Sequence, residues 1–322
     1  MKKVTFFAAM LFSLQMLQGN IVHQENIKAE WKEEQVPAFD ELMLSWNGAR
    51  PVDGNYSFYI SVKTEAWSPW LLYATWGSDK QASFLNTTDV EPVRVYQDAL
   101  EVLEGKKATG FQIKIVPEGS ASLDALYGLH VYTNSDKKQE AEQVSASLLP
   151  VNLTVIGLSQ MTLKHERHKD LCSPTSTAAV VKYLSKNEAI SAVNFAQKAW
   201  DSGFDIFGNW VFNVAQAAAE LGPTWSCWVE RLSGFEAIYQ QLMRGTPVVV
   251  SVRGPLSGSA CPYPSGHLIA VTGFDPIEQK VRCMDPAFPS DDQTNVVYDL
   301  ADFVQAWNRR GRVAYLFNKK IN

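Results

Sequence analysis

The chain has 322 residues, of which 46% are hydrophobic and 20% charged, and its formal net charge at pH 7 is −5. This composition supports a sizeable core and excludes an intrinsically disordered or low-complexity protein. A mildly acidic chain without basic clusters is poorly suited to nucleic acid, so no nucleic-acid partner is expected. The length favours two domains, and four cysteines are too few for a disulfide-built scaffold.

The first residues have the pattern of a secretory signal. Lys2 and Lys3 precede an apolar run over residues 4–17, which is too short to span a bilayer stably. A small residue, Gly19, then offers a cleavage site. We therefore expect residues 1–19 to be a signal peptide of a secreted or periplasmic protein with no stable membrane span. An uncleaved signal-anchor is the alternative.

Residues 20–145 have the pattern of an all-β domain. Apolar and polar residues alternate over 56–62 and 111–116, and turn-forming residues separate such segments. Short strands at this spacing predict a β-sandwich or a jelly-roll-like domain. Residues 92–103 fit either a helix or an extended connector. A charged and polar stretch at 136–143 is the expected domain boundary.

Residues 146–322 follow a different pattern, in which helices come first and strands afterwards. Helices are predicted after Pro174 and at 192–200, 210–221, 235–244 and 300–310. Strands are predicted at 247–252, 267–274, 280–284 and 313–317. This order is typical of an α+β domain.

Cys172 is the first candidate for a catalytic residue. It stands just before Pro174, which is suited to the first turn of a helix because its missing N–H is no loss there. The free N–H groups and the dipole at a helix start favour a thiolate, so Cys172 is a candidate nucleophile. A structural cysteine packed near a helix end is the alternative. The sequence leaves open whether it pairs with Cys227, Cys261 or Cys283.

Among the five histidines, His267 is the best candidate for a base. It opens an apolar strand and therefore projects from a rigid element. His165 and His168 have a spacing that can hold a metal, but two further ligands at suitable spacing are not evident. We interpret that segment as a solvated loop, and we predict neither a metal nor a cofactor.

Asp285 is predicted to orient His267. If residues 267–274 and 280–285 form an antiparallel hairpin centred on Pro276, His267 directly faces Asp285. Residues so paired have Cβ atoms about 4.5–5.5 Å apart. A slip of one residue would place the two side chains on opposite faces of the sheet. The alternative is that Asp285 and Pro286 only end a strand.

Gln160 is the fourth candidate. Acyl transfer needs a hydrogen-bond donor where negative charge develops on the substrate oxygen. The side-chain amide of Gln160 can supply one beside the backbone N–H of Cys172. A glutamine alone carries no such meaning, so this prediction depends on the other three residues.

The candidate residues stand in the order of a known group. The matching segments are Gln160, 172–176, 245–250, 266–275 and 284–287. Over about residues 150–320 the chain resembles the bacteriocin-processing-type cysteine peptidases, family thirty-nine of the cysteine class in the papain-like clan. The resemblance implies a papain-like α+β fold with Cys172 as nucleophile and His267 as base. It also implies that Asp285 orients the histidine and that Gln160 lies in the oxyanion hole. The commoner form has glycine after the cysteine, where this chain has Ser173.

Five of the ten tryptophans lie between Trp31 and Trp76. Exposed rings on a β-sandwich can stack on sugars, so the β-domain could bind polysaccharide, with core packing as the alternative. We predict a secreted cysteine peptidase that cleaves a peptide or protein substrate through a Cys-His-Asp triad with a glutamine oxyanion hole. The alternatives are a catalytically inert surface- or wall-binding protein and an amide hydrolase or transacylase acting on peptidoglycan peptides.

Overall fold

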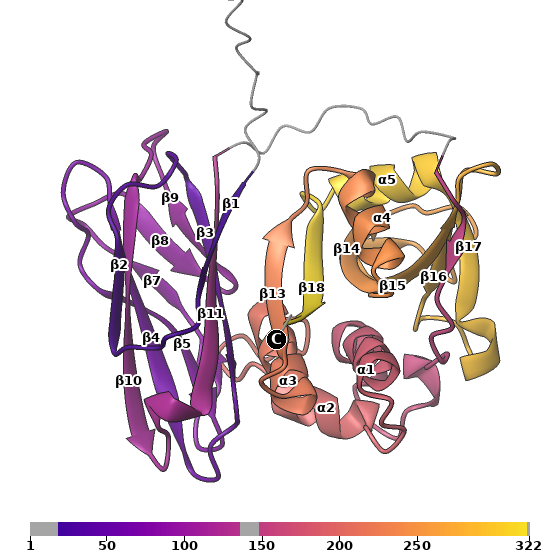
Figure 1. Cartoon of the computed structure of the whole chain (residues 1–322), viewed down its shortest axis with the longest axis horizontal. Coiled ribbons are helices and arrows are strands. Elements are labelled where there is room, and N and C mark those ends of the chain that lie inside the picture. Colours follow the sequence, from indigo (N-terminus) through magenta and orange to yellow (C-terminus); the bar gives the residue numbers. More distant parts are fainter. Residues whose placement is uncertain (1–18, 136–147, 321–322) are drawn as a thin grey trace, which may run out of the picture.

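The computed structural model describes residues 19–135 and 148–320. The predicted signal peptide, apart from Gly19, and the predicted boundary at 136–143 therefore lie outside the described residues. A β-half that ends before residue 136 packs against a mixed α/β half that begins after residue 147 (Figure 1). Within the described ranges, no helix is long and apolar enough to cross a membrane.

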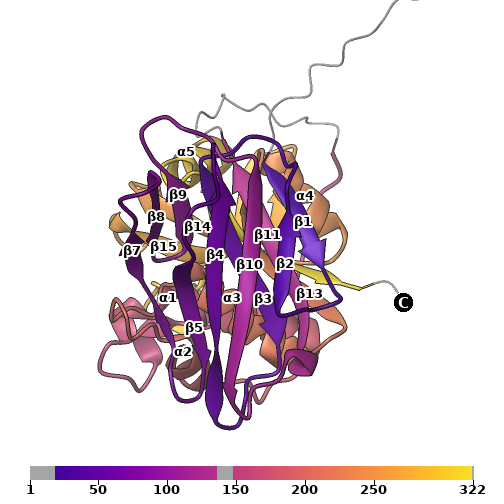
Figure 2. The same cartoon turned by 90° about the vertical axis from the view of Figure 1, so that its left-hand side faces the viewer.

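The β-half consists of two antiparallel sheets. Its strands are β1 (Asn20–Gln24), β2 (Glu30–Glu33), β3 (Glu41–Gly48), β4 (Gly54–Lys63), β5 (Leu71–Gly77), β6 (Ala82–Ser83), β7 (Leu85–Thr87), β8 (Val93–Tyr96), β9 (Ala99–Val102), β10 (Gly110–Gly119) and β11 (Leu126–Asn134). One sheet has the order β1-β11-β3-β9-β8-β7 and the other β2-β10-β4-β5-β6. The two sheets lie face to face, as Figures 1 and 2 show together, which confirms the predicted sandwich.

Two details of the β-half settle points that the sequence left open. Residues 92–103 form the hairpin of β8 and β9, with Val93 opposite Val102, so this segment is extended and not helical. Trp31, Trp46 and Trp76 are buried and serve the core. Trp67 and Trp70 are half-buried, each with a lysine ammonium over its ring.

The second half contains every predicted helix and strand. Its helices are α1 (Cys172–Ser185), α2 (Ala192–Ala199), α3 (Trp210–Leu221), α4 (Phe235–Met243) and α5 (Leu300–Asn308). Its strands are β12 (Val151–Asn152), β13 (Trp225–Arg231), β14 (Val248–Gly254), β15 (Tyr263–Asp275), β16 (Lys280–Met284), β17 (Asn295–Asp299) and β18 (Val313–Lys319). The prediction missed β12, β13 and β17. β13 and β17 are the two edge strands of their sheet, and both carry the charged residues that edges tolerate.

Helices cover both faces of the second sheet, whose order is β13-β18-β14-β15-β16-β17 with β12 paired to β15. Alternate residues of β14 face opposite sides: Val249 joins a core with α1, α2 and α3, whereas Val248 and Val250 join a core with α4 and α5. The first of these cores continues into the β-half, where the ring of Trp46 lies 5.8 Å from that of Phe212 on α3. The two halves therefore share one core.

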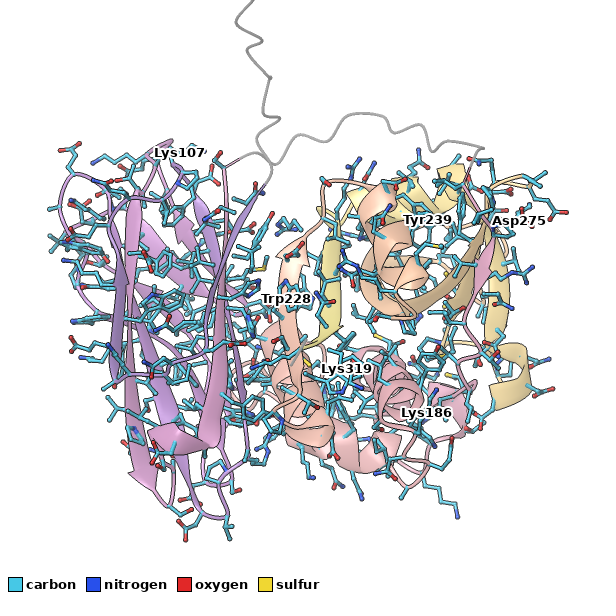
Figure 3. The ribbon with its side chains drawn as sticks, in the orientation of Figure 1. Lys107, Lys186, Trp228, Tyr239, Asp275 and Lys319 are labelled. Carbon is cyan, nitrogen blue, oxygen red and sulfur yellow. The ribbon has the colours of Figure 1, made fainter. Side chains whose placement is uncertain are left out.

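Polar side chains of β3 bind the outer edge of β13. Asn47 accepts a hydrogen bond from the backbone N–H of Cys227 at 2.8 Å and donates one to its carbonyl at 2.7 Å. Ser45 accepts from the N–H of Val229 at 3.1 Å. These side chains satisfy backbone groups that an edge strand leaves unpaired. Figure 3 shows Trp228 of the same strand at the boundary between the halves.

We expect Asn47→Ala to lower the free energy of unfolding by about 2–4 kcal/mol, because the N–H and C=O of Cys227 would lose their partners inside the interface. Urea denaturation followed by tryptophan fluorescence measures this. Asn295→Ala, at an exposed position of β17, is the matched control and should change stability by less than about 0.5 kcal/mol. Equal losses in the two variants would contradict the role given to Asn47.

Candidate active site

Cys172 is the first residue of α1, as expected from Pro174. The residue is partly exposed, whereas the following helical turn is buried. The hydroxyl of Ser176 donates to the backbone carbonyl of Leu268 at 2.9 Å, which joins the start of α1 to β15 one residue beyond His267. The helix start and the strand that carries the imidazole are thus held together.

Ser173 occupies the position where the commoner form of the resembled family has glycine. Its side chain is fully buried, and its hydroxyl lies 2.9 Å from the hydroxyl of Tyr315 on β18. The serine is therefore part of the packing beneath the thiol, and its side chain points away from solvent.

His267 and Asp285 form a buried pair. The Nε2 of His267 lies 2.8 Å from Oδ1 of Asp285, and the two residues are 5% and 0% exposed. The ring of Tyr263 stacks on the imidazole with centroids 4.1 Å apart and planes at 20°. One ring nitrogen is therefore occupied by the carboxylate, and the ring plane is fixed by the tyrosine.

The pairing of β15 with β16 corrects the predicted register. Ala270 lies opposite Met284, so the same register, continued by one residue, places Asp285 opposite Ile269. The predicted direct pairing of His267 with Asp285 is wrong by two positions, because the turn lies further along the chain than assumed. The contact forms nevertheless, since residues two apart share a face and a diagonal neighbour is within reach.

A β-bulge at Thr272 keeps the imidazole and the carboxylate on one face of the sheet. On the turn side of the bulge, Gly273 pairs with Arg282, a register one residue away from that of Ala270 and Met284. If this register continued along the strands without the bulge, Asp285 would lie opposite Ala270, on the other face of the sheet from His267. The carbonyl of Thr272 accepts a hydrogen bond from the N–H of Leu153 at 2.8 Å, just beyond β12.

Four donors surround the carboxylate of Asp285. Besides His267, the hydroxyls of Tyr263 and Tyr298 donate to Oδ2 at 2.7 Å each, and the N–H of Ala287 donates to Oδ1 at 3.0 Å. Burial alone would raise the pKa of Asp285, but the charge and hydrogen bond of His267, helped by Tyr298 and Ala287, hold it below its ordinary value.

Sequence reasoning missed both tyrosines. The position of Tyr263 could have been inferred from the sequence, because it lies four residues before His267 in one strand and so on the same face. Tyr298 comes from the separate strand β17, and no sequence pattern indicates its contact with Asp285.

The thiol and the imidazole shift each other's pKa in opposite directions. Burial would raise the pKa of Cys172, but the hydrogen bond and charge of His267, with backbone N–H groups of Leu268 and Ser173, lower it below its ordinary value. Burial would lower the pKa of His267, but Asp285 first and then Cys172 raise it. These opposite shifts favour a thiolate beside an imidazolium.

Gln160 lies near the pair, with its amide turned elsewhere. It is 3% exposed, and its backbone N–H donates to the carbonyl of Pro286 at 2.9 Å. Its Nε2 donates to the carbonyls of His168 and Lys169 at 3.2 and 2.7 Å, while its buried Oε1 has no partner in the described part of the chain. In this conformation Gln160 braces the turn that leads into Cys172.

The other cysteines and the histidines His165 and His168 form no comparable thiol–imidazole pair in the described part of the chain. All four cysteines lie in the described ranges and are free, so Cys172 is not bridged. Burial raises the pKa of Cys227 and of Cys283. His165 and His168 form a local turn with backbone contacts to each other and to Arg167. Among the residues described, no group of three or more His, Cys, Asp and Glu could hold a metal.

A cleft of about 630 Å³ opens at Cys172. The second half contributes Gly266, Trp210 and Arg310 to its lining, and the β-half contributes Asp98 among others. The thiol therefore faces a space that both halves enclose. A volume of this size is in the usual range for ligand sites in proteins.

Comparisons with known proteins identify a family and one solved structure. The model of the family described as "Peptidase_C39 like family" matches residues 152–315. A crystal structure described as a candidate C39-like peptidase from Bacillus anthracis is 18% identical, with a TM-score of 0.40 over 54% of this chain and 100% of that one. Among curated proteins, none matches.

We expect iodoacetamide to label Cys172 at a pH below the ordinary range of a thiol, about 8.5, because His267 lowers its pKa. His267→Ala should move the labelling profile to higher pH, since burial then dominates. Peptide mapping by mass spectrometry, in a Cys261→Ser background that removes the exposed thiol, measures the rate at each site. Buried Cys227 and Cys283 should stay unlabelled in the folded protein.

The matched comparison is Tyr183→Phe, which removes a hydroxyl elsewhere on α1 and should leave the profile unchanged. An ordinary thiol profile at Cys172 in the wild type would contradict the coupling to His267.

Proposed function

Because this chain belongs to the Peptidase C39 like family, we propose that it is a cysteine peptidase in which Cys172, His267 and Asp285 act as a triad. One observation carries the proposal: a cysteine at a helix start bonds through its thiol to an imidazole whose other nitrogen is bound to a buried carboxylate. This is the arrangement that activates a nucleophile through a base held by a third group.

In the first step the thiolate of Cys172 attacks the carbonyl carbon of the scissile bond. The carbonyl oxygen becomes an oxyanion, and the backbone N–H of Cys172 is the donor best placed to bind it. Within the described ranges this N–H has no acceptor, as expected for the first residue of a helix. When the intermediate collapses, the amine leaves with a proton from the His267 imidazolium.

In the second step water releases the acyl group. His267, now neutral, takes a proton from the water as it attacks the thioester. The carboxylic acid product leaves, and the thiolate and imidazolium are restored. Asp285 stays ionised throughout, held by the donors around it, and stabilises the imidazolium in both resting and product states.

For Gln160 we propose a positioning role in place of the oxyanion-hole role that the sequence predicts. Both hydrogens of its amide bind carbonyls of the turn before Cys172. It would join the oxyanion hole only by giving up the longer bond, to His168. Its first function in this arrangement is to position the N–H of Cys172.

The substrate proposed is a peptide or protein chain, which reaches the thiol through the cleft between the halves. A papain-like fold for the second half and export of the protein remain parts of the proposal. Three of the five clustered tryptophans are buried, which leaves polysaccharide binding by the β-half without support from them.

Cys172→Ala and His267→Ala should each abolish cleavage of a diverse peptide library, because neither nucleophile nor base can be replaced by a neighbour. Asp285→Asn should lower kcat roughly 10²- to 10⁴-fold, since it keeps the shape but loses the charge that holds the imidazolium. Product formation is followed by mass spectrometry. Asp275→Asn, at the far end of β15, is the matched control and should retain wild-type turnover. Cleavage by Cys172→Ala at the wild-type rate would refute the proposal.

Gln160→Ala should lower kcat about 10²-fold and leave KM nearly unchanged, whether the amide binds the oxyanion or positions the N–H that does. Steady-state kinetics on one cleaved peptide measures both constants. Thr162→Ala, two residues further along the same short turn and exposed, is the control. A variant that affects KM alone would place Gln160 in substrate binding instead.

A further inference from the structure

Arg310 lies in the cleft beside the histidine. It follows α5, where its backbone N–H donates to the carbonyl of Trp307 at 3.0 Å. Its guanidinium carbon lies 5.5 Å from the ring centroid of Trp210 on α3. It also packs on Gly266: a Cβ added there would lie 3.4 Å from Nε of Arg310. Because Gly266 immediately precedes His267, this guanidinium borders the site of bond cleavage.

The outer nitrogens of Arg310 have no acceptor. Nε donates to the hydroxyl of Ser251 at 3.1 Å, but neither Nη has a hydrogen-bond partner anywhere in residues 19–135 or 148–320. The other arginines that line the cleft already form ion pairs. Arg231 binds Glu41 through two hydrogen bonds of 2.6 and 2.7 Å, and Arg167 binds two aspartates. Arg310 is thus the arginine of the cleft with free donors.

The carboxylate whose charge acts on Arg310 does not bind these donors. Asp98, from the β-half, accepts a hydrogen bond at 2.6 Å from the N–H of Trp210, the first residue of α3. It attracts Arg310 through its charge alone, and burial raises its pKa to about 7, so much of it is neutral at neutral pH. Burial and the charges of Arg253 and Arg231 lower the pKa of Arg310, a cost that a bound anion would offset.

We propose that Arg310 binds a carboxylate of the peptide substrate next to the scissile bond, and that this protein prefers peptides with a carboxylate at that position. The inference rests on the proposed function, which supplies the peptide and the position of its cleaved bond. The planar guanidinium, held between Trp210 and Gly266, presents two parallel N–H donors that match a carboxylate. The carboxylate comes from an aspartate or glutamate side chain, or from the free C-terminus of a short peptide.

Two pairs of thiol-directed probes distinguish these sources. The first pair are peptidyl acyloxymethyl ketones, which alkylate a thiolate with loss of a carboxylate. The two members of this pair differ only in having glutamate or glutamine at the first or second residue before the ketone. In the other pair, iodoacetyl-glycine and iodoacetyl-glycinamide alkylate with loss of iodide and differ only in the terminal carboxylate. The rate of adduct formation at Cys172 is measured by mass spectrometry in the Cys261→Ser background.

We expect the wild type to react on the order of tenfold faster with the charged member of at least one pair. Preference for the glutamate probe identifies a side chain as the source, and preference for iodoacetyl-glycine identifies a C-terminus. The ratio should fall to near one in Arg310→Gln and keep an intermediate value in Arg310→Lys. Arg253→Gln removes a nearby charge that does not line the cleft, and it should retain the wild-type ratio.

The result that overturns the inference is a ratio near one in the wild type for both pairs, or an unchanged ratio in Arg310→Gln. A thiol that is inert to every probe would instead defeat the proposed function. Binding then decides the inference, because labelled glutamate and glutamine peptides can be titrated by fluorescence anisotropy against Cys172→Ala with and without Arg310→Gln. Circular dichroism checks that each variant is folded.

Discussion

The site depends on one buried charge. The carboxylate of Asp285 is fully inaccessible to solvent, and such a charge is stable only when donors replace the water it has lost. Two tyrosine hydroxyls, a backbone N–H and the imidazole of His267 do so. The imidazole is thereby held in one orientation, with its remaining nitrogen free to face Cys172. β15 and β17 contribute the two tyrosines and the histidine, and the segment after β16 contributes Asp285 and Ala287.

The sequence predicted this arrangement well where the signals were local. Pro174 marked the start of α1, and apolar runs marked β14, β15 and β18, so the thiol and the imidazole could be assigned to the right elements. The partnership of His267 with Asp285 was found through a register that is wrong by two positions. It held because an even error preserves the face of the sheet. The error is even only because of the bulge at Thr272, which shifts the pairing by one residue. No sequence signal indicates this bulge.

Features that depend on distant contacts were not predictable in this way. The amide of Gln160 is held by carbonyls of a turn whose path only the folded chain defines. The interface between the two halves could likewise not be predicted from the sequence. In the structure, Ser45 and Asn47 are polar residues in a strand whose residues are all buried. Buried polar residues in a strand indicate a partner for their hydrogen bonds. Arg310 gave no signal of its own because Trp210 and Gly266 reach it from other parts of the chain.

The contact between β3 and β13 has a consequence for how such a protein can evolve. The outer border of β13 obtains its partners from side chains that belong to the β-half. A gene rearrangement that transferred the C-terminal half alone would produce a molecule with an open strand, free to recruit another chain into its sheet. Inheritance of the two halves as one unit is therefore favoured by colloidal stability. A replacement for the first half would have to supply the same spacing of amide and hydroxyl groups.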